Sequence, residues 1–301
     1  MSSTDLLRLG TRGSLLARTQ SRATADALMR LHPDLRVELK IIQTSGDKFT
    51  DRPLAEAGGK GLFTKEIELA LLANEVDFAV HSLKDVPVTM PLVDQADLVI
   101  AAIPVREDPR DVLVSRQAKS LTDLPAGAIV GTGSERRRCQ ILAARPDLKV
   151  APLRGNIDTR LRKLEQGDYA AIILALAGVN RLGRFDSALM TPIEADVLMP
   201  AAGQGALALQ CRRGDARTVR FLAAMDDPAT RDAVNTERAV VQYLNGDCHS
   251  AIAALAQINN GQLRLHAAYG KPDGSVKRTS QSGPVSEGNK LAHAAAQILI
   301  E

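Results

Sequence analysis

The stretch GTGSERRRCQ, residues 131–140, joins a short apolar run to a charged segment. The run before it, Ala128-Ile129-Val130, has the pattern of a buried strand. Residues 135–144 have the mixed pattern of a helix, and Ser134 stands at the N-cap position. Residues 131–134 are therefore predicted to form a strand-to-helix turn of an α/β fold, where free backbone N–H groups favour an anion.

Arginines follow this turn in a position that electrostatics disfavours. Arg136 and Arg137 fall in the first helical turn, where the helix macrodipole repels cations. One interpretation is that both side chains point into solvent, and the other is that an anion binds beside them. Two more predicted strand-to-helix turns, at 11–14 and 153–160, also carry arginine. The repetition favours a ligand with several carboxylate or phosphate groups, which arginine binds through paired hydrogen bonds.

Short apolar strands alternate with amphipathic helices along the chain, which predicts an α/β fold. The expected strands are 7–10, 37–41, 76–80, 98–103, 112–114, 128–130, 148–151, 171–174, 206–210, 263–269 and 276–279. The expected helices are 15–31, 63–71, 135–144, one from 157, 178–183, 228–244 and 287–300. Proline and glycine near residues 104 and 200 indicate two chain crossings between domains. We expect a first domain of residues 1–104 with 200–224, a second of residues 105–199, and a small α+β third domain of residues 225–301.

Composition narrows the classes of function. The chain has 301 residues, of which 45% are hydrophobic, 24% charged and 3% aromatic, with no tryptophan and a net charge of +3. So few rings argue against a single-stranded nucleic-acid platform, and so small a charge does not indicate a nucleic-acid partner. The 3 cysteines and 5 histidines lack metal-ligand spacing, so no metal site is expected. Without a signal-peptide or transmembrane pattern, we expect a cytoplasmic protein with reduced thiols and no membrane partner.

Two further places in the chain suit chemistry. Lys84 and Asp85 follow a predicted strand, and ligands of α/β sheets bind at the carboxyl ends of strands; a surface ion pair between the two is the alternative. Cys248 lies in a predicted loop, where a thiol can be a nucleophile, a covalent attachment point or an inert group. The chain has no complete nucleotide-binding motif: Arg136 occupies the third glycine position of G-x-G-x-x-G, and no P-loop motif occurs. The G-x-S-x-G motif of hydrolases does not occur either.

Nine motifs occur in the order found in the porphobilinogen deaminase family, also called hydroxymethylbilane synthases, and the chain resembles that family. They are LGTRGS (9–14), TSGD (44–47), GGKGLFTKE (58–66), AVHSLKDVP (79–87), REDPRD (106–111), GTGSERRRCQ (131–140), LRGNIDTRLRKL (153–164), PAAGQGA (200–206) and GDC (246–248).

The resemblance implies a transferase of tetrapyrrole biosynthesis, the route to haem and chlorophyll precursors. It would deaminate four porphobilinogen molecules, couple them head to tail on a dipyrromethane cofactor, and release hydroxymethylbilane. Cys248 would hold the cofactor through a thioether, and Asp85 would be the catalytic residue that stabilises the cation left when ammonia departs. The positions that bind cofactor and substrate side chains correspond to Arg12, Ser14, Ser82, Lys84, Thr132, Ser134, Arg136, Arg137, Arg154, Arg160, Arg181 and Gln204.

The resemblance also implies two α/β domains of periplasmic-binding-protein type, a third domain that carries the cysteine, and a mobile lid at residues 44–61. A monomer is expected, with hand-off of the product to the next enzyme of the pathway. The chain departs from the family at Gly133, where serine is common, at Asp247, where glycine is frequent, and at 249–251, a stretch that often contains proline.

Two other classes of function remain open from the residues alone. An anion receptor without chemistry would use the same arginines, but it would give Asp85 and Cys248 no role. A nucleic-acid binder would also use them, although they lie in separate turns beside acidic residues. A steep salt dependence of oligonucleotide binding would indicate the second class.

Overall fold

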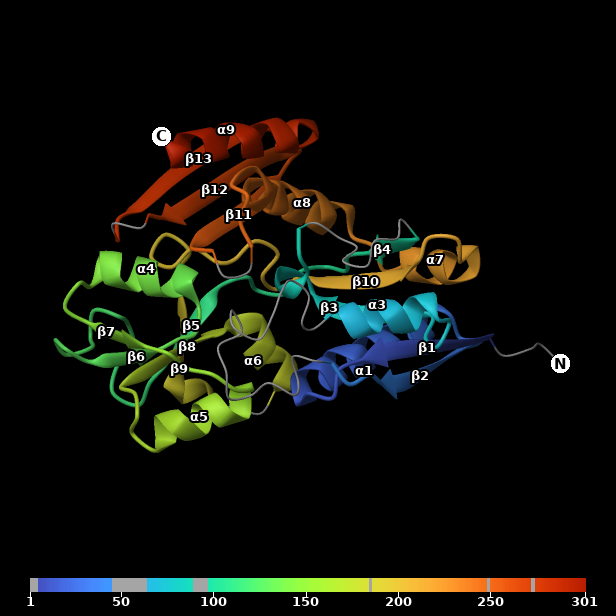
Figure 1. The fold of residues 1–301 in the computed structure, drawn as a ribbon, viewed down its shortest axis with the longest axis horizontal. Helices are drawn as coiled ribbons and strands as arrows, with labels where there is room; N and C mark the ends of the chain where they lie inside the picture. The colour runs from blue at the N-terminus through green and yellow to red at the C-terminus, as the bar shows by residue number, and fades with distance from the viewer. Residues whose placement is uncertain (1–4, 45–63, 89–96, 184–185, 248–249, 272–273) are drawn as a thin grey trace. The chain divides into compact units, whose positions relative to one another are not determined.

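The computed structural model describes residues 5–44, 64–88, 97–183, 186–247, 250–271 and 274–301. Contacts divide the chain into two compact units (Figure 1). Unit 1 is Met1–Arg106 with Ala206–Arg231, and unit 2 is Glu107–Gly205 with Asp232–Glu301. The division into three domains that the sequence suggests stays a prediction.

Unit 1 is built on a sheet with the strand order β2-β1-β3-β10-β4. The first three strands run parallel, and β10 is antiparallel to both of its neighbours. The strands are β1 (Asp5–Thr11), β2 (Leu35–Ile41), β3 (Phe78–Ser82), β4 (Leu98–Ala102) and β10 (Leu207–Arg212). The helices are α1 (Leu15–Leu31), α3 (Lys65–Leu72) and α7 (Ala216–Ala223), and a 3-10 turn, η1 (Leu83–Asp85), follows β3.

Both faces of this sheet are covered at its centre, and the strands β3 and β4 are accordingly apolar over most of their length. Phe78 and Val80 of β3 belong to a core shared with Leu28 of α1. Ala79, between them in sequence, belongs to the core on α3, with Leu71. Successive residues of a strand point to opposite faces, so β3 reaches both helical layers while its carboxyl end stays open to the following turn.

Unit 2 contains a sheet of the same design, with the order β7-β6-β8-β5-β9. Here β6, β7 and β8 run parallel, and β5 is antiparallel to both of its neighbours. The strands are β5 (Asp111–Val114), β6 (Ile129–Gly131), β7 (Lys149–Ala151), β8 (Ala171–Ala175) and β9 (Met190–Ile193). The helices are α4 (Glu135–Ala144), α5 (Ile157–Glu165) and α6 (Leu176–Leu182), with a 3-10 turn η2 (Ser187–Leu189) before β9.

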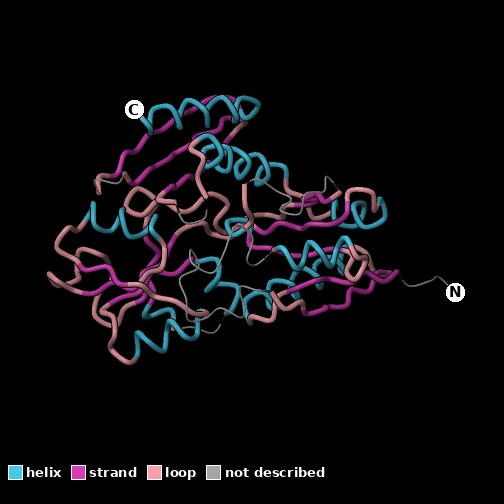
Figure 2. Tube along the Cα trace, in the orientation of Figure 1, coloured by secondary structure: helices cyan, strands magenta, loops and turns pink. Residues whose placement is uncertain are grey.

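Figure 2 shows α4 on one side of this sheet and α5 on the other. Leu113 and Ile173 pack with Ile141 of α4. The neighbouring strand residues Val112 and Ile172 belong to the opposite core, with side chains of α5 and α6. The sheet therefore fixes α4 through its buried side chains, and the amino end of α4 lies just after β6 in the chain.

Unit 2 also carries a three-stranded antiparallel sheet, β11-β12-β13, near the C-terminus. Its strands are β11 (Ile252–Asn259), β12 (Gln262–Gly270) and β13 (Val276–Pro284). After a 3-10 turn, η3 (Val285–Glu287), helix α9 (Gly288–Ile300) lies against this sheet (Figure 1). Helix α8 (Pro228–Tyr243) begins in unit 1 and continues in unit 2.

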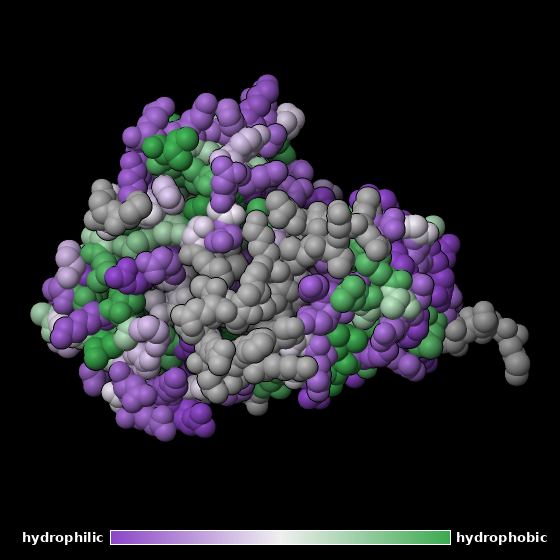
Figure 3. All heavy atoms as spheres, in the orientation of Figure 1, coloured by the Kyte–Doolittle hydropathy of each residue, from purple (hydrophilic) through white to green (hydrophobic). Residues whose placement is uncertain are grey.

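The predicted fold class, α/β with a small C-terminal α+β part, is confirmed by this topology. Helices α1 and α4 have the predicted bounds, and β3 begins two residues later than predicted. The strands β9 and β11 and helix α7 were not predicted. Of the described helices, none has the length and apolar character needed to cross a membrane. Hydrophilic side chains cover much of the visible described surface, with smaller hydrophobic areas between them (Figure 3).

Candidate functional site

The first predicted turn of unit 1 follows β1 and leads into α1. Ser14 is the N-cap of α1, and its Oγ accepts a hydrogen bond from the Ala17 amide at 3.3 Å. Thr11 at the end of β1 accepts a hydrogen bond from the Ser21 hydroxyl at 2.8 Å, which fixes the strand end against the helix. Arg12 lies half-buried between these two anchors. The backbone of this turn is therefore held from both sides of the arginine.

The second turn of unit 1 carries Lys84 and Asp85. It is a 3-10 turn held by Leu83 and Val86, which are 0% and 3% exposed. Asp85 itself is exposed. Ser82, just before the turn, lies 3.4 Å from the Gln20 amide of α1. Two buried hydrophobic anchors thus present a carboxylate to solvent at the carboxyl end of β3.

Behind this turn lies a buried polar chain from β3 to α3. The His81 ring Nε2 lies 2.9 Å from Oε1 of Gln210, and the Gln210 amide donates to Oε1 of Glu68 at 3.0 Å. Burial lowers the pKa of His81 to about 4, and the nearby charge of Arg12 acts in the same direction. The imidazole is therefore neutral at pH 7, and Arg12 is close enough to it to matter electrostatically.

In unit 2, the turn after β6 lies close against the segment that follows β7. The Thr132 amide donates to the Ala151 carbonyl at 3.0 Å, and the Thr132 hydroxyl accepts from the Ser134 amide at 3.2 Å. Ser134 is the N-cap of α4, as predicted, but its side chain makes no capping hydrogen bond. A Cβ on Gly133 would lie 2.9 Å from the backbone oxygen of Leu153. Glycine at this position lets the two turns come into direct contact.

Arg136 and Arg137 lie on the first turn of α4 and converge on one buried carboxylate. This is Asp111, the first residue of β5, which is 0% exposed. Arg136 Nη1 donates to Asp111 Oδ2 at 2.8 Å and to the Met199 carbonyl at 2.6 Å. Arg137 donates to Asp111 Oδ1 from Nη2 at 2.7 Å and from Nε at 3.2 Å, and its Nη1 donates to the Ile173 carbonyl at 3.0 Å.

The charges in this cluster do not balance. The interpretation that both arginines point into solvent is wrong, because their side chains are 5% and 6% exposed. Burial alone would raise the pKa of Asp111, but the charges and hydrogen bonds of the two arginines outweigh burial and hold the pKa well below its usual range. Burial lowers the pKa of Arg136, and Asp111 only partly opposes this. Two buried guanidinium groups share one carboxylate, so the cluster keeps a positive charge that favours a second anion.

The third basic turn, after β7, leads into α5. Asn156 caps α5 by accepting from the Thr159 amide at 2.9 Å. Arg160 Nε donates to the Gly155 carbonyl at 2.8 Å, which folds this side chain back over the turn. Gly155 has φ +106°, and a Cβ there would lie 2.8 Å from the Thr159 methyl group, so the turn requires glycine. Arg154 is exposed at the head of the same turn.

Gln204 and Arg181 fix the segment by which the chain leaves unit 2. Gln204 Nε2 donates to Asp111 Oδ1 at 2.8 Å and to the Pro109 carbonyl at 2.7 Å, so Gln204 joins the arginine cluster. Arg181 Nη2 donates to the Gly205 carbonyl at 2.6 Å, and burial lowers the pKa of Arg181. Both side chains hold backbone carbonyls within this unit.

Cys248 and most of the predicted lid, residues 45–61, lie outside the described residues. The residues that flank 248–249 are described, and the Ser250 hydroxyl donates to the Asp247 carboxylate at 2.9 Å. Gly246 and Ser250 line a cavity of about 460 Å³ together with residues of α4. Its lining includes Glu135, Arg138 and Cys139 on one side and Leu244, Asn245, Gly246, Ser250 and Ala251 on the other. Residues of α4 and residues near Cys248 therefore share one cavity, and neither Arg136 nor Arg137 is part of its lining.

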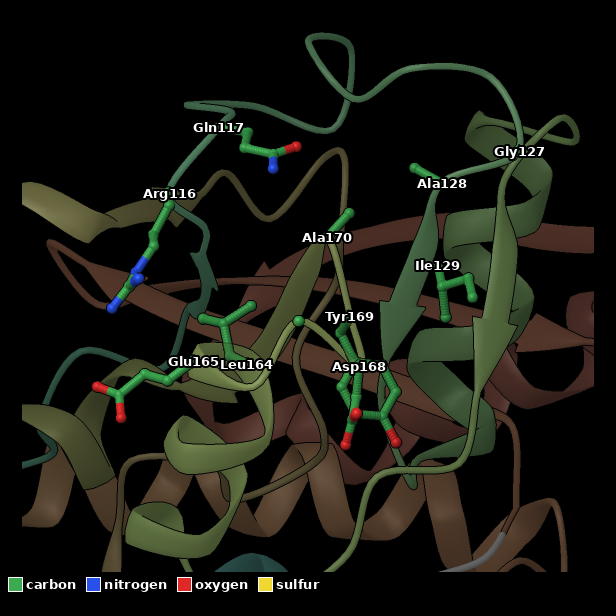
Figure 4. Close-up of a pocket in the computed structure, with 11 residues that line it drawn as sticks. Arg116, Gln117, Gly127, Ala128, Ile129, Leu164, Glu165, Asp168, Tyr169 and Ala170 are labelled. Carbon is green, nitrogen blue, oxygen red and sulfur yellow. The ribbon is translucent and has the colours of Figure 1, made fainter.

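A second cavity of about 460 Å³ lies elsewhere in unit 2 (Figure 4). Figure 4 shows its lining side chains, among them Arg116, Glu165 and Tyr169. It adjoins residues 127–129 and 167–170, where β6 and β8 begin, whereas the predicted site residues follow the carboxyl ends of these strands. None of the predicted site residues lines it.

Comparison with known proteins identifies the family. The description "Porphobilinogen deaminase, dipyromethane cofactor binding domain" matches residues 7–220, and "Porphobilinogen deaminase, C-terminal domain" matches residues 232–301. The chain belongs to the porphobilinogen deaminase family. This confirms the family inferred from the nine motifs.

Curated proteins named porphobilinogen deaminase are similar over almost the whole chain. The one from Roseiflexus castenholzii is 46% identical over 295 residues, which cover 98% of this chain and 96% of the relative. The one from Syntrophobacter fumaroxidans is 46% identical over 297 residues, which cover 98% of this chain and 94% of the relative. Solved structures with a similar chain trace include the methionine-binding protein MetQ, with a TM-score of 0.46 and 14% identity over 73% of this chain and 89% of that one. A putative methionine-binding lipoprotein from Bacillus subtilis also has a TM-score of 0.46. It is 15% identical, and the match covers 77% of this chain and 94% of the lipoprotein chain.

Two residues that hold the candidate site together cannot be identified as site residues from the local sequence pattern. Asp111 was quoted in a motif without a role, although a charged residue at the head of an apolar strand is itself a signal of a buried partner. Glu237 of α8 is 0% exposed and accepts from the Gly203 amide at 2.7 Å and the Ala256 amide at 2.8 Å. It ties the turn that contains Gln204 to β11, and nothing in the local sequence pattern points to that contact.

Proposed function

We propose that this protein deaminates four porphobilinogen molecules and couples them head to tail on a covalently bound dipyrromethane, releasing hydroxymethylbilane. Its membership of the porphobilinogen deaminase family supports the activity. The observation that carries the proposal is the buried pair Arg136 and Arg137, which shares the single carboxylate of Asp111. A site with this uncompensated charge favours a ligand that brings carboxylates of its own.

The residues present fit a dipyrromethane, whose pyrrole rings carry carboxylate side chains. Arg136, Arg137, Thr132 and Ser134 of unit 2 would hold these side chains, since Ser134 has a hydroxyl that does not cap α4. The other proposed binding residues are Arg12, Ser14, Ser82, Lys84, Arg154, Arg160, Arg181 and Gln204. When bound, the group supplies the pyrrole carbon to which the first substrate is joined.

Asp85 is the proposed catalytic residue. In each round the carbon–nitrogen bond of porphobilinogen breaks and ammonia leaves with the electron pair. The methylene carbon left by ammonia would then bond to the free α-carbon of the terminal pyrrole, which would lose a proton, and after four rounds water would cleave the bond to the dipyrromethane and release hydroxymethylbilane. An exposed carboxylate on a turn held by Leu83 and Val86 can stabilise the positive charge that develops on the substrate.

Cys248 is the proposed attachment point, through a thioether between its sulfur and the dipyrromethane. Gly246 and Ser250, on either side of it, line a cavity with Glu135, Arg138 and Cys139 of α4, which supports attachment beside this helix. We further propose a cytoplasmic monomer that passes hydroxymethylbilane to the next enzyme of the pathway.

The test is the intact mass of the purified protein beside a Cys248→Ser variant. We expect the native protein to carry the extra mass of a dipyrromethane and the variant to lack it. If the native protein is unmodified, it is incubated with porphobilinogen, which should then add that mass. A native protein that gains no mass under either condition would contradict the proposal and favour an anion receptor.

A further inference from the structure

Helix α4 is linked to the C-terminal sheet of unit 2 by a chain of side-chain hydrogen bonds. Gln140 lies one helical turn after Arg136 and is 2% exposed. Its Nε2 donates to the Met199 carbonyl at 3.1 Å, and its Oε1 accepts from the Met199 amide at 2.9 Å. One side-chain amide thus holds both backbone groups of Met199, as a neighbouring strand would.

The Met199 carbonyl is also an acceptor for Arg136. Nη1 of that arginine reaches it at 2.6 Å and reaches Asp111 at 2.8 Å. Fixing the carbonyl therefore fixes one of the two acceptors that orient this guanidinium. Without Gln140, the Met199 carbonyl would lose the side-chain amide that fixes it, and Arg136 would keep only Asp111 as a firmly held acceptor.

The outer end of the chain is Arg278 on β13. Its Nη2 donates to Gln140 Oε1 at 3.0 Å and to the Val197 carbonyl at 3.1 Å, and its Nη1 donates to the Asp196 carbonyl at 2.5 Å. The Gln140 Oε1 accepts from two donors, and the Gln140 Nε2 donates to the carbonyls of Met199 and Arg136. A flipped amide would place Nε2 against the two donors, so only one orientation of the amide satisfies every group.

We propose that Gln140 and Arg278 are positioning residues that orient Arg136 for the carboxylates of the bound polypyrrole. Neither residue touches the ligand in this scheme. They act through Met199. Their loss should weaken binding rather than slow turnover, because a pre-oriented arginine loses less conformational freedom when the ligand binds. The inference rests on the proposed function, since it assumes that Arg136 binds those carboxylates.

The test compares Gln140→Met and Arg278→Met with the native protein. Methionine keeps an unbranched side chain of similar length and removes the hydrogen bonds. We expect KM for porphobilinogen to rise about 5- to 20-fold in Gln140→Met and about 2- to 5-fold in Arg278→Met, with kcat within about twofold. Loading of the unmodified protein with dipyrromethane, followed by intact mass, should slow in the same order.

Arg264→Met is the matched control, because Arg264 is an exposed arginine on the neighbouring strand β12. It should leave KM and loading unchanged. In the double variant Gln140→Met/Arg278→Met, KM should resemble that of Gln140→Met alone, because residues acting through one chain are not additive.

If both single variants keep the KM and the loading rate of the native protein, even with a lowered Tm, the inference is overturned. The hydrogen-bond chain through Gln140 and Arg278 would then have a purely structural role. Independent, multiplying effects in the double variant would overturn it as well. A native protein that never takes up dipyrromethane would instead contradict the proposed function, so the two failures are distinguishable.

Discussion

Asp85 and Asp111 are aspartates with opposite environments in this protein. Asp111 is fully buried beneath two arginines, whereas Asp85 is exposed on a turn between buried anchors. The first can only hold its partners, because both of its oxygens accept hydrogen bonds from side chains of unit 2. The second has the access to a substrate that a catalytic carboxylate requires.

Replacing Asp85 by alanine should therefore remove turnover without unfolding the protein. We expect kcat to fall by about two to three orders of magnitude, the usual loss when one preorganised electrostatic group is removed. Steady-state kinetics and thermal unfolding of Asp85→Ala would be measured beside Asp34→Asn, which changes another exposed aspartate of unit 1. Near-native turnover in Asp85→Ala would take Asp85 out of the catalytic role.

His81 makes the stability of the protein depend on pH in mildly acid solution. Its pKa is about 4 in the folded protein and near 6.5 in the unfolded chain, so the unfolded chain binds the proton first as pH falls. Stability should therefore decline from about pH 6.5 to pH 4, by up to about 1.4 kcal/mol per pH unit from this residue. His81→Gln should remove that slope and His293→Gln, at an exposed position on α9, should keep it, as measured by urea unfolding. Equal slopes in the two variants would contradict this assignment.

The arginine pair shows what could be predicted at the scale of a residue. The helix dipole argument predicts from the sequence alone that an anionic ligand lies beside Arg136 and Arg137. The negative group that the structure places there is the protein's own Asp111, 25 and 26 residues away, and the ligand stays a prediction. Asp111 reaches them because β5 enters the sheet beside β8, a pairing that no local pattern encodes.

At the scale of elements, the contact between the turns after β6 and β7 depends on glycine. A side chain at Gly133 would place its Cβ 2.9 Å from the Leu153 backbone oxygen, and backbone cannot move aside as a flexible side chain can. A serine at this position would therefore push the two basic turns apart.

Gly133→Ser should lower the free energy of unfolding by about 1–3 kcal/mol, the usual cost of overpacking. Gly214→Ala is the control, since a Cβ there meets nothing within 4 Å. Thermal unfolding of both variants checks the expectation. A Gly133→Ser protein as stable as Gly214→Ala would mean that the turns separate at no cost.

Periodicity predicted the long helices well and the irregular elements poorly. Helix α1 has a clear apolar stripe, and the predicted bounds agree with the structure to the last residue.

The strand β9 contains Pro192, which normally argues against a strand but is tolerated here because β9 lies at the edge of its sheet. β11 begins Ile252-Ala253-Ala254-Leu255-Ala256, an alanine-rich run whose composition suits a helix as well as a strand. Pairing with β12 decides between them, and pairing is not a local property.

At the scale of the whole molecule, the proposed cofactor should act as a stabiliser. Although covalently attached, it would contact Arg136 and Arg137 only in the folded chain and would neutralise buried positive charge there, so these contacts should favour the folded state. We expect the loaded protein to have a Tm about 5 °C or more above the unloaded protein, since about 1 kcal/mol shifts Tm by 2–4 °C in chains of this size class. Cys248→Ser, incubated with porphobilinogen, should keep the Tm of the unloaded protein. An equal Tm with and without the group would contradict a cofactor held by the arginine pair.

The order of strands in unit 1 also bears on how the chain is made by the ribosome. In the sheet β2-β1-β3-β10-β4, the strand β4 has β10 as its neighbour, and β10 is synthesised only after residues 107–205. The nascent chain therefore completes all five strands β5 to β9 of the second sheet while β3 and β4 still wait for the strand between them. An unpaired strand edge invites association with other chains, so we expect the N-terminal half of the nascent chain to be prone to such association until residue 212 emerges.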